Sequence, residues 1–199
     1  MRWRRKKQKQ SGNSTLNSTG GTEASNKILI VPRGALHATH QFFSPYWTAG
    51  VETGCYWFGI SAGDFDVVTT LALPKLYQSP GGFRVDSRSM RRLAKTMSQQ
   101  RLENLAQLHT HPSNWVGHSA FDDDHAYSTR PGSLSLVWPN YGLSLNHDLT
   151  GIGIHEYRTG VWNELSPDEV RERIRVIDSV ADGRWQIEGG FTTHVERDF

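Results

Sequence analysis

The chain has 199 residues and a formal net charge of +2, and hydrophobic residues make up 36% of it. This length suits one domain with a proper core and is short for two domains of ordinary size. No run approaches the ~20 apolar residues that a membrane-spanning helix needs, so we expect a soluble protein. Cys55 is the single cysteine, which excludes an intramolecular disulfide and favours a cytoplasmic location.

The first 26 residues show no apolar periodicity. A basic stretch, MRWRRKKQKQ, precedes a run rich in Ser, Gly, Asn and Thr, and this composition predicts a disordered tail over residues 1–26. No apolar segment follows the basic residues, so the stretch is not a secretory signal. The basic tail could contact nucleic acid, acidic lipid or an acidic partner. A solubilising terminus without a ligand is the simpler expectation.

Strands and helices are predicted to alternate through the first half of the domain. In chain order we expect a strand over 27–32, a helix over 33–43 that Pro45 closes, a hairpin turning near Ala62-Gly63, a loop at Gly81-Gly82 with a short strand after it, and a helix over 87–100 with Ser87 as its N-cap.

The second half continues this alternation. We expect a strand over 104–111, a short helix over 119–127, a strand over 133–139, a hairpin turning at Thr159-Gly160, and an amphipathic helix over 166–180 that begins with a capping box at Ser166, Pro167 and Glu169. Residues 27–199 are therefore predicted to form one α/β domain, with a single mixed sheet flanked by helices and an amphipathic helix at its C-terminal end.

The segment LHTHPSNWVGHSAFD carries the most informative pattern. His109, His111 and Asp122 offer two imidazoles and a carboxylate, a ligand set that a catalytic zinc ion uses when it leaves a fourth position for water. Residues two apart on a strand point the same way, so the two histidines can converge. Ser119 and Asp122 lie three apart at a helix start and share one side of it. The sequence thus predicts a metal site with a hydroxyl beside it.

A hydrolytic zinc site also needs a carboxylate that accepts a proton from water. Glu52 is the best candidate, because it begins the otherwise apolar stretch VETGCYWFG, where a charged residue is rare unless it is paired or functional. An ion pair with an arginine is the alternative for Glu52. Ser119 is also a plausible N-cap of its helix, and it can serve both purposes.

Other reactive residues have simpler explanations. Cys55 lies in the apolar run GCYWFGI, so we expect a buried core residue and not a thiol nucleophile. His118 and His125 are left out of the metal-ligand set; His125 could bond to Asp122 from the same helix face. Trp115 is expected to line the substrate groove, with core packing as the alternative.

An upstream Glu followed by H-x-H-P, Ser and Asp resembles the motif of the JAMM (JAB/MPN) metalloprotease family. The resemblance implies that Glu52 is the base, that His109, His111 and Asp122 hold zinc, and that Ser119 stabilises the oxyanion. It also implies the MPN/JAB cytidine-deaminase-like fold over most of the chain. The segment VWPNYG is similar to bacterial members associated with ubiquitin-like conjugation.

This resemblance implies a zinc-dependent isopeptidase that removes a ubiquitin-like modifier from target proteins. The implied partners are a ubiquitin-like protein or its conjugates, together with activating and conjugating enzymes, and no membrane. A zinc amidohydrolase acting on a small molecule or a peptide-linked metabolite is the main alternative. A non-catalytic scaffold is disfavoured by the complete residue set, and nothing in the folded part supports nucleic-acid binding.

Overall fold

One large mixed sheet forms the centre of the molecule, as predicted. The computed structural model describes residues 27–143 and 148–178, and the predicted tail over 1–26 lies outside them. The strand order is β10-β1-β3-β2-β6-β7-β8-β9. These strands are β1 (Ile28–Pro32), β2 (Gly54–Ala62), β3 (Phe65–Ala72), β6 (Glu103–Thr110), β7 (Leu134–Trp138), β8 (Gly153–Arg158), β9 (Val161–Glu164) and β10 (Ile174–Ile177).

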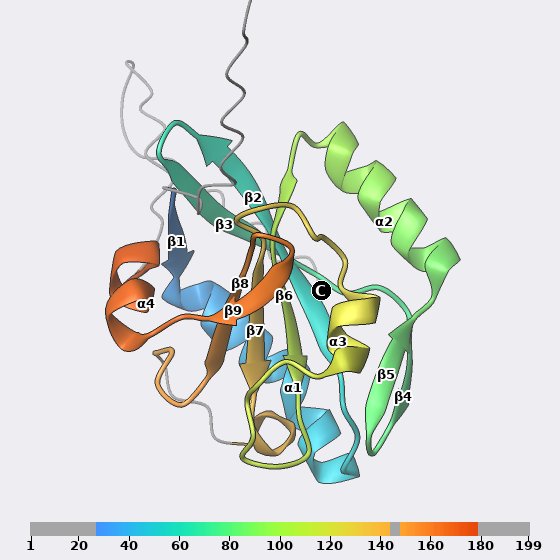
Figure 1. Ribbon diagram of the computed structural model, residues 1–199. Helices are drawn as coiled ribbons and strands as arrows, with labels where there is room; N and C mark the ends of the chain where they lie inside the picture. Colours follow the sequence, from blue (N-terminus) through green and yellow to red (C-terminus); the bar gives the residue numbers. More distant parts are fainter. Residues whose placement is uncertain (1–26, 144–147, 179–199) are drawn as a thin grey trace, which may run out of the picture.

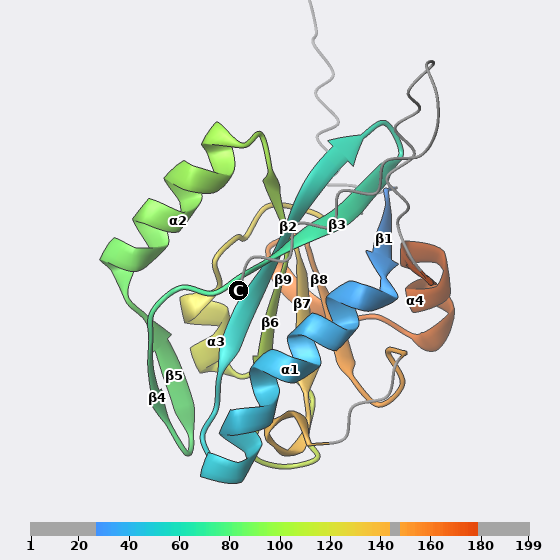
Figure 2. The same ribbon diagram turned by 180° about the vertical axis from the view of Figure 1, so that it is seen from behind.

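Parallel and antiparallel pairs mix in this sheet, and helices flank it. β1 runs parallel to β10 and β3, and β6 runs parallel to β7, whereas the other neighbours are antiparallel. Helix α1 (Arg33–Ala49) crosses the face that is in front in Figure 2. On the side seen in Figure 1 lie α2 (Ser87–Gln99) and the short α3 (Ala120–His125), and α4 (Pro167–Arg173) packs near β1 and β10. No helix of the described segments is long and apolar enough to span a membrane.

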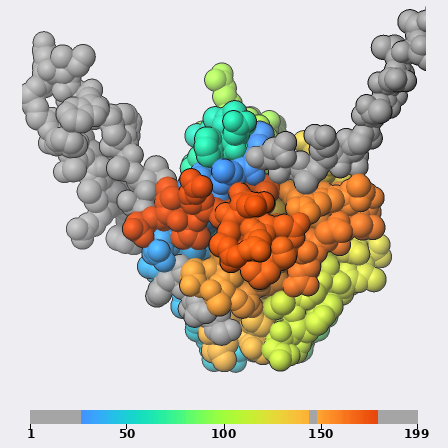
Figure 3. Space-filling view, turned by 60° about the vertical axis from the view of Figure 1, so that its left-hand side comes forward, coloured from blue at the N-terminus to red at the C-terminus, as the bar shows by residue number. Residues whose placement is uncertain are grey.

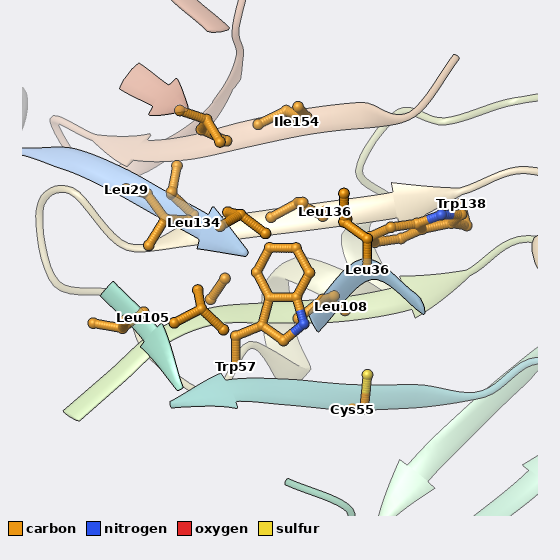
Figure 4. Close-up of a cluster of buried hydrophobic side chains, with 14 of the residues drawn as sticks. Leu29, Leu36, Cys55, Trp57, Leu105, Leu108, Leu134, Leu136, Trp138 and Ile154 are labelled. Atoms are coloured by element: carbon orange, nitrogen blue, oxygen red, sulfur yellow. The ribbon is translucent and has the colours of Figure 1, made fainter. Parts of the chain in front are cut away.

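The central strand β2 is buried on both faces and joins two apolar clusters. Cys55 and Trp57 point into the larger cluster, where Figure 4 shows the indole of Trp57 in the middle. Tyr56 and Phe58 point the other way, against apolar residues of α2. The buried thiol has a pKa raised well above its ordinary value by burial, which agrees with the prediction of a core cysteine.

Two helix boundaries differ from the predicted ones. Helix α1 does not stop at Pro45 but continues to Ala49 and ends at Gly50, which has a φ of +64°. Proline cannot donate to the carbonyl of Gln41, and the hydroxyl of Ser44 donates to that oxygen instead, at 3.1 Å. Asp86, and not Ser87, caps α2; its carboxylate accepts the backbone N–H of Ser89 at 2.7 Å.

The predicted helix over 166–180 is wrong in its second half. The capping box at Ser166 and Glu169 is present, but the helix ends at Arg173, and the chain continues as β10, parallel to β1. The β-branched residues of the sequence Ile-Arg-Val-Ile favour a strand, and β10 pairs with a β1 edge that would otherwise be open.

The loop and strand predicted around Gly81-Gly82 are a complete hairpin. β4 (Leu76–Ser79) and β5 (Gly82–Val85) pair with each other and form a second, two-stranded sheet, which the single-sheet prediction did not include. Figure 1 shows this hairpin on the far side of α3 from β6.

Candidate metal centre

The two histidines of the motif leave the end of β6 side by side. β6 is held between β2 and β7, where His109 lies opposite Gly54 and Val137. His111 follows the strand, and its backbone N–H donates to the carbonyl of Trp138 at 2.8 Å. The Nε2 atoms of His109 and His111 are 3.2 Å apart, and both residues are buried.

Asp122 reaches the histidines from the first turn of α3, oriented by a capping box. The Ser119 side chain caps the helix by accepting the Asp122 N–H at 3.1 Å. In return, the hydroxyl and the N–H of Ser119 both donate to Oδ2 of Asp122, at 2.6 and 2.8 Å. Ser119 is therefore an N-cap, as one of its two predicted roles required, and it fixes the carboxylate.

The separations of these ligand atoms suit a tetrahedral ion. Asp122 Oδ1 lies 3.4 Å from His109 Nε2, and Asp122 Oδ2 lies 3.3 Å from His111 Nε2. In a tetrahedral site with bonds of about 2.0–2.1 Å, neighbouring ligand atoms are about 3.3–3.4 Å apart. Among the described residues, His109, His111 and Asp122 are the group that meets the requirement for a metal-binding cluster. The residues therefore fit a metal ion.

Trp115 fixes the orientation of the His111 ring. Its backbone carbonyl lies 3.1 Å from Nδ1 of His111, which assigns the proton to Nδ1 and leaves the Nε2 lone pair facing the other ligands. The indole also stacks on the imidazole, with ring centroids 4.9 Å apart and planes at 10°. Trp115 is 52% exposed, so the core-packing alternative is wrong.

The electrostatics of the three residues favour a cation among them. Burial alone would raise the pKa of Asp122, but its contacts with the rings of His109 and His111 hold it well below its usual range. Burial lowers the pKa of His109, although the nearby Asp122 carboxylate acts to raise it. Burial acts to lower the pKa of His111 as well, but the contact with the Asp122 carboxylate outweighs the effect of burial, and the pKa of His111 is raised. A partly buried carboxylate thus faces two buried imidazoles, and a positive ion between them would neutralise its charge.

Glu52 lies beside this group, in the short segment between α1 and β2. Its backbone N–H donates to the carbonyl of Ser79 at 3.0 Å, and the next residue, Thr53, pairs with Thr110 at the end of β6. Burial raises the pKa of Glu52 to about 7, with His111 lowering it and Asp122 raising it. Within the described residues Glu52 has no ion pair with an arginine, which was the alternative to a functional role.

The loop between His111 and Ser119 is anchored on strand β8. The carbonyl of Val116 lies 2.9 Å from Nε2 of His155. A Cβ on Gly153 would lie 2.0 Å from the same carbonyl oxygen, so only glycine allows this approach. Figure 3 shows the yellow-green segment after β6 beside the orange surface of β8 and β9. The ligands before and after this loop are therefore held by the sheet.

A strained turn supports the histidine end of the loop. Asn140, Tyr141 and Gly142 have φ values of 50°, 55° and 82°. The N–H of Tyr141 donates to the carbonyl of His111 at 2.7 Å, and that of Asn140 donates to Ser113 at 2.8 Å. Positive φ at two consecutive non-glycine residues is costly, and such strain is typical of functional sites.

A cavity of about 490 Å³ opens beside the site. His109 and Asp122 contribute to its wall, so it reaches the ligand group. Phe83 of β5 also lines the cavity, and it packs so closely over Gly54 that a Cβ there would lie 2.6 Å from the ring. The remaining lining residues come from β2, β4, β5, β6 and the segments that carry α2 and α3: Tyr56, Tyr77, Arg84, Val85, Asp86, Ser87, Gln107, Leu108, Phe121 and His125. Trp115 is not among them.

The structure brings all five predicted site residues together: Glu52, His109, His111, Ser119 and Asp122. His125 does not bond to Asp122; its Nδ1 lies 2.9 Å from the carbonyl of Phe121. His118 stays outside the ligand group but contacts His109, with ring centroids 5.7 Å apart. Sequence reasoning missed the cavity residues of β5, and the run FRV carried no signal for them.

Comparisons with known proteins agree with this picture. No protein-family model matches the chain. The chain is 26% identical over 158 residues to a probable metalloprotease from Sinorhizobium fredii, covering 77% of this chain and 96% of that protein. A protein of Desulfitobacterium hafniense with a known solution structure superimposes with a TM-score of 0.53 at 18% identity, covering 77% of this chain and 95% of the other. A JAB1/MPN domain protein from Archaeoglobus fulgidus gives 0.39 at 16% identity, covering 76% and 98%, and carries no argument at that score.

Fold and site together define a mixed α/β protein with a His-His-Asp group suited to a metal ion at the end of a central strand. The match covers 96% of the relative that is named as a probable metalloprotease. The metalloprotease named as a relative and the His-His-Asp group agree with the resemblance to the JAMM (JAB/MPN) metalloproteases that the motif predicted.

Proposed function

We propose that this protein is a zinc-dependent peptidase that hydrolyses the isopeptide or peptide bond at the C-terminus of a ubiquitin-like modifier. The ligands would be His109, His111 and Asp122, with Glu52 as the general base. The observation that supports this most is the close approach of the three side chains: the two Nε2 atoms lie 3.2 Å apart, and each lies 3.3 or 3.4 Å from a different carboxylate oxygen of Asp122. The Glu52 carboxyl, with its raised pKa, lies beside them.

The three side chains of the ligand group favour zinc as the bound ion. Two imidazoles and one carboxylate are borderline and hard ligands, and three protein ligands are the number that catalytic zinc sites use. Bound zinc would polarise the scissile carbonyl and lower the pKa of a water molecule. The relative from Sinorhizobium fredii, named a probable metalloprotease, supports the peptidase class.

Glu52 is suited to move protons in this reaction. In the metal-free site its pKa is about 7, and a group with a pKa near the working pH can both accept a proton and give it up. In the proposed mechanism Glu52 takes a proton from the attacking water and delivers it to the departing lysine amine. A carboxylate of ordinary pKa would be a weaker proton acceptor in this role.

Ser119 would stabilise the developing negative charge. Its hydroxyl now donates to Asp122, and its backbone N–H donates to the same oxygen. The hydroxyl can therefore turn to the carbonyl oxygen of the substrate while the N–H keeps the carboxylate in place. Such a donor commonly contributes about 3 kcal/mol to the transition state.

The substrate itself requires a direct test. A ubiquitin-like protein fused through its C-terminus to a reporter, and a lysine-linked conjugate, are incubated with the protein with and without a chelator. We expect chelator-sensitive cleavage by the wild type and by Glu103→Gln, because Glu103 is exposed at the start of β6, and none by Glu52→Gln. Cleavage of small amides alone would support the amidohydrolase alternative, and no cleavage of either would contradict the proposal.

A further inference from the structure

Helix α3 carries Asp122 but has little apolar anchoring. It spans only Ala120–His125, and none of its residues is buried. A helix of this length is not stable by itself in water and normally depends on packing of an apolar face. The position of Asp122, on which the spacing of the metal ligands depends, must therefore be secured by other contacts.

A buried histidine ties the beginning of α3 to the sheet. Nδ1 of His118 lies 2.6 Å from Oδ1 of Asp123 on α3, and its Nε2 lies 2.8 Å from Oγ of Ser135 on β7. Only 5% of the His118 side chain is exposed. Its ring packs against His155 and Trp162, with centroids 5.1 and 4.8 Å away. The histidine is thus fixed between the helix and β7.

The same hydrogen-bond chain continues to the other end of α3. The side-chain amide of Gln107 donates to Oγ of Ser135 at 3.2 Å, and its carbonyl accepts the backbone N–H of Tyr127 at 2.8 Å. Gln107 belongs to β6, two residues before His109. Both ends of the helix are therefore linked to the two strands that carry or flank the histidine ligand.

Each hydrogen bond of this chain has one defined direction. Asp123 can only accept, so Nδ1 of His118 donates, and in the neutral ring Nε2 then accepts. The hydroxyl of Ser135 must then donate to Nε2, and it accepts from Gln107. Each of the four hydrogen bonds therefore joins a donor to an acceptor, and such a continuous, partly buried chain restrains the residues that it links.

The order Ser135, His118, Asp123 is also that of a serine hydrolase triad, but the burial of the serine excludes this role. Ser135 is 0% exposed in the middle of β7, and its hydroxyl has no path to a substrate. A nucleophile must reach the carbonyl that it attacks. The chain therefore has a positioning function.

We propose that the hydrogen-bond chain Tyr127–Gln107–Ser135–His118–Asp123 is the device that holds α3, and so Asp122, at ligand distance from His109 and His111. His118 is its central positioning residue. This inference rests on the proposed metal site, since it explains how one ligand of that site is kept in place. It also predicts that residues outside the ligand group set the metal affinity.

Two variants break the chain at different points, and a third serves as a matched control. Ser135→Ala removes the central hydroxyl and otherwise changes the side-chain volume little. Asp123→Ala removes the terminal acceptor from the surface of α3. Asp124→Ala makes the same chemical change one residue later, on the same exposed helix, outside the chain.

Zinc affinity is measured by competition with a chromophoric chelator, and amide hydrogen exchange over 119–127 is measured in the metal-free protein. We expect Ser135→Ala and Asp123→Ala each to weaken zinc binding about tenfold and to speed amide exchange. The double variant should bind zinc about as tightly as the single variant with the lower zinc affinity, because both changes break the same chain. Asp124→Ala should stay within about twofold of the wild type on the same affinity scale.

Equal zinc affinities and equal exchange rates in Asp123→Ala and Asp124→Ala would overturn the inference. Failure of the wild type to bind zinc would instead contradict the proposed function. In that case the amide exchange rates of the metal-free protein alone test whether the hydrogen-bond chain holds α3. Faster exchange in Ser135→Ala and Asp123→Ala supports the inference, and unchanged exchange overturns it.

Discussion

The imidazole of His111 lies between the backbone and the side chain of a single residue, Trp115. The carbonyl of Trp115 fixes Nδ1 at 3.1 Å, and the indole covers the ring at a centroid distance of 4.9 Å. The tautomer and the tilt of this ligand are therefore both set by a residue four positions further along the chain. Trp115 is 52% exposed and His111 only 4%, so the stacked indole separates the imidazole from solvent on this side.

Replacing Trp115 separates these two contacts. In Trp115→Ala the carbonyl bond is kept and the stacking, typically worth about 0.5–1.5 kcal/mol, is lost. We expect zinc affinity to fall about 2–10-fold by that energy, with Trp115→Phe close to the wild type. Chelator competition measures both variants, and an alanine variant with wild-type affinity would show that the indole does not support the ligand.

The ionised Glu52 carboxylate should lower the stability of the metal-free protein. Its pKa is raised from 4.5 to about 7, chiefly by burial. Between these two pH values the folded state binds more protons than the unfolded state, so this group lowers the stability progressively as pH rises. Above pH ~7 the whole penalty is present, and below pH ~4 both states are protonated and it vanishes.

Glu52→Gln should remove this penalty. We expect the variant to be more stable than the wild type above pH ~7, by on the order of 1–3 kcal/mol, and equal to it near pH ~4. Urea unfolding in the presence of a chelator, repeated across this pH range, measures the difference. A variant that is less stable at pH 8 would mean that the carboxylate has a stabilising partner.

The buried carboxylate of Glu156, paired with two arginines, should contribute strongly to the free energy of unfolding. Glu156 is 0% exposed and accepts from Nε of Arg173 at 2.8 Å and from Nε of Arg158 at 2.5 Å. Glu156→Gln removes the charge that both arginines face, and we expect a loss of ~3–5 kcal/mol in the free energy of unfolding. The exposed Glu172→Gln should change little. Similar denaturant midpoints for the two variants would contradict this role.

Gly153 should be required for the loop between the metal ligands. A methyl group there would meet the Val116 carbonyl at 2.0 Å, so Gly153→Ala must displace the loop or β8. We expect a loss of ~1–3 kcal/mol in stability and weaker zinc binding. Gly34→Ala, at an open position on α1, should be neutral or slightly stabilising. A Gly153 variant with unchanged zinc affinity would show that the loop tolerates the shift.

Sequence spacing predicted the ligand group well because the signals are local. His109 and His111 share a strand end, and Ser119 and Asp122 share one helical turn, so periodicity alone brings each pair together. Glu52 is different: its charge at the start of an apolar stretch marks it as a candidate, but its place beside the histidines depends on the long-range pairing of Thr53 with Thr110, which no local pattern predicts.

The errors lie where tertiary contacts overrode local preference. The helix predicted over 166–180 ends at Arg173, since the next residues pair with β1 and Arg173 is drawn to the buried Glu156. The link between His118 and Ser135 joins residues 17 positions apart on different elements, and no spacing rule predicts it. Hydrophobic patterns describe faces of elements but not the polar contacts between them.

The measurement that tests the central claim most directly is the metal content of purified wild type, Glu52→Gln and His109→Ala, determined by elemental analysis. The claim is that His109, His111 and Asp122 hold one ion and that Glu52 acts beside it without being a ligand. We predict about one zinc ion per chain in the wild type and in Glu52→Gln, and almost none in His109→Ala. Equal zinc in His109→Ala, or none in the wild type, would contradict the account.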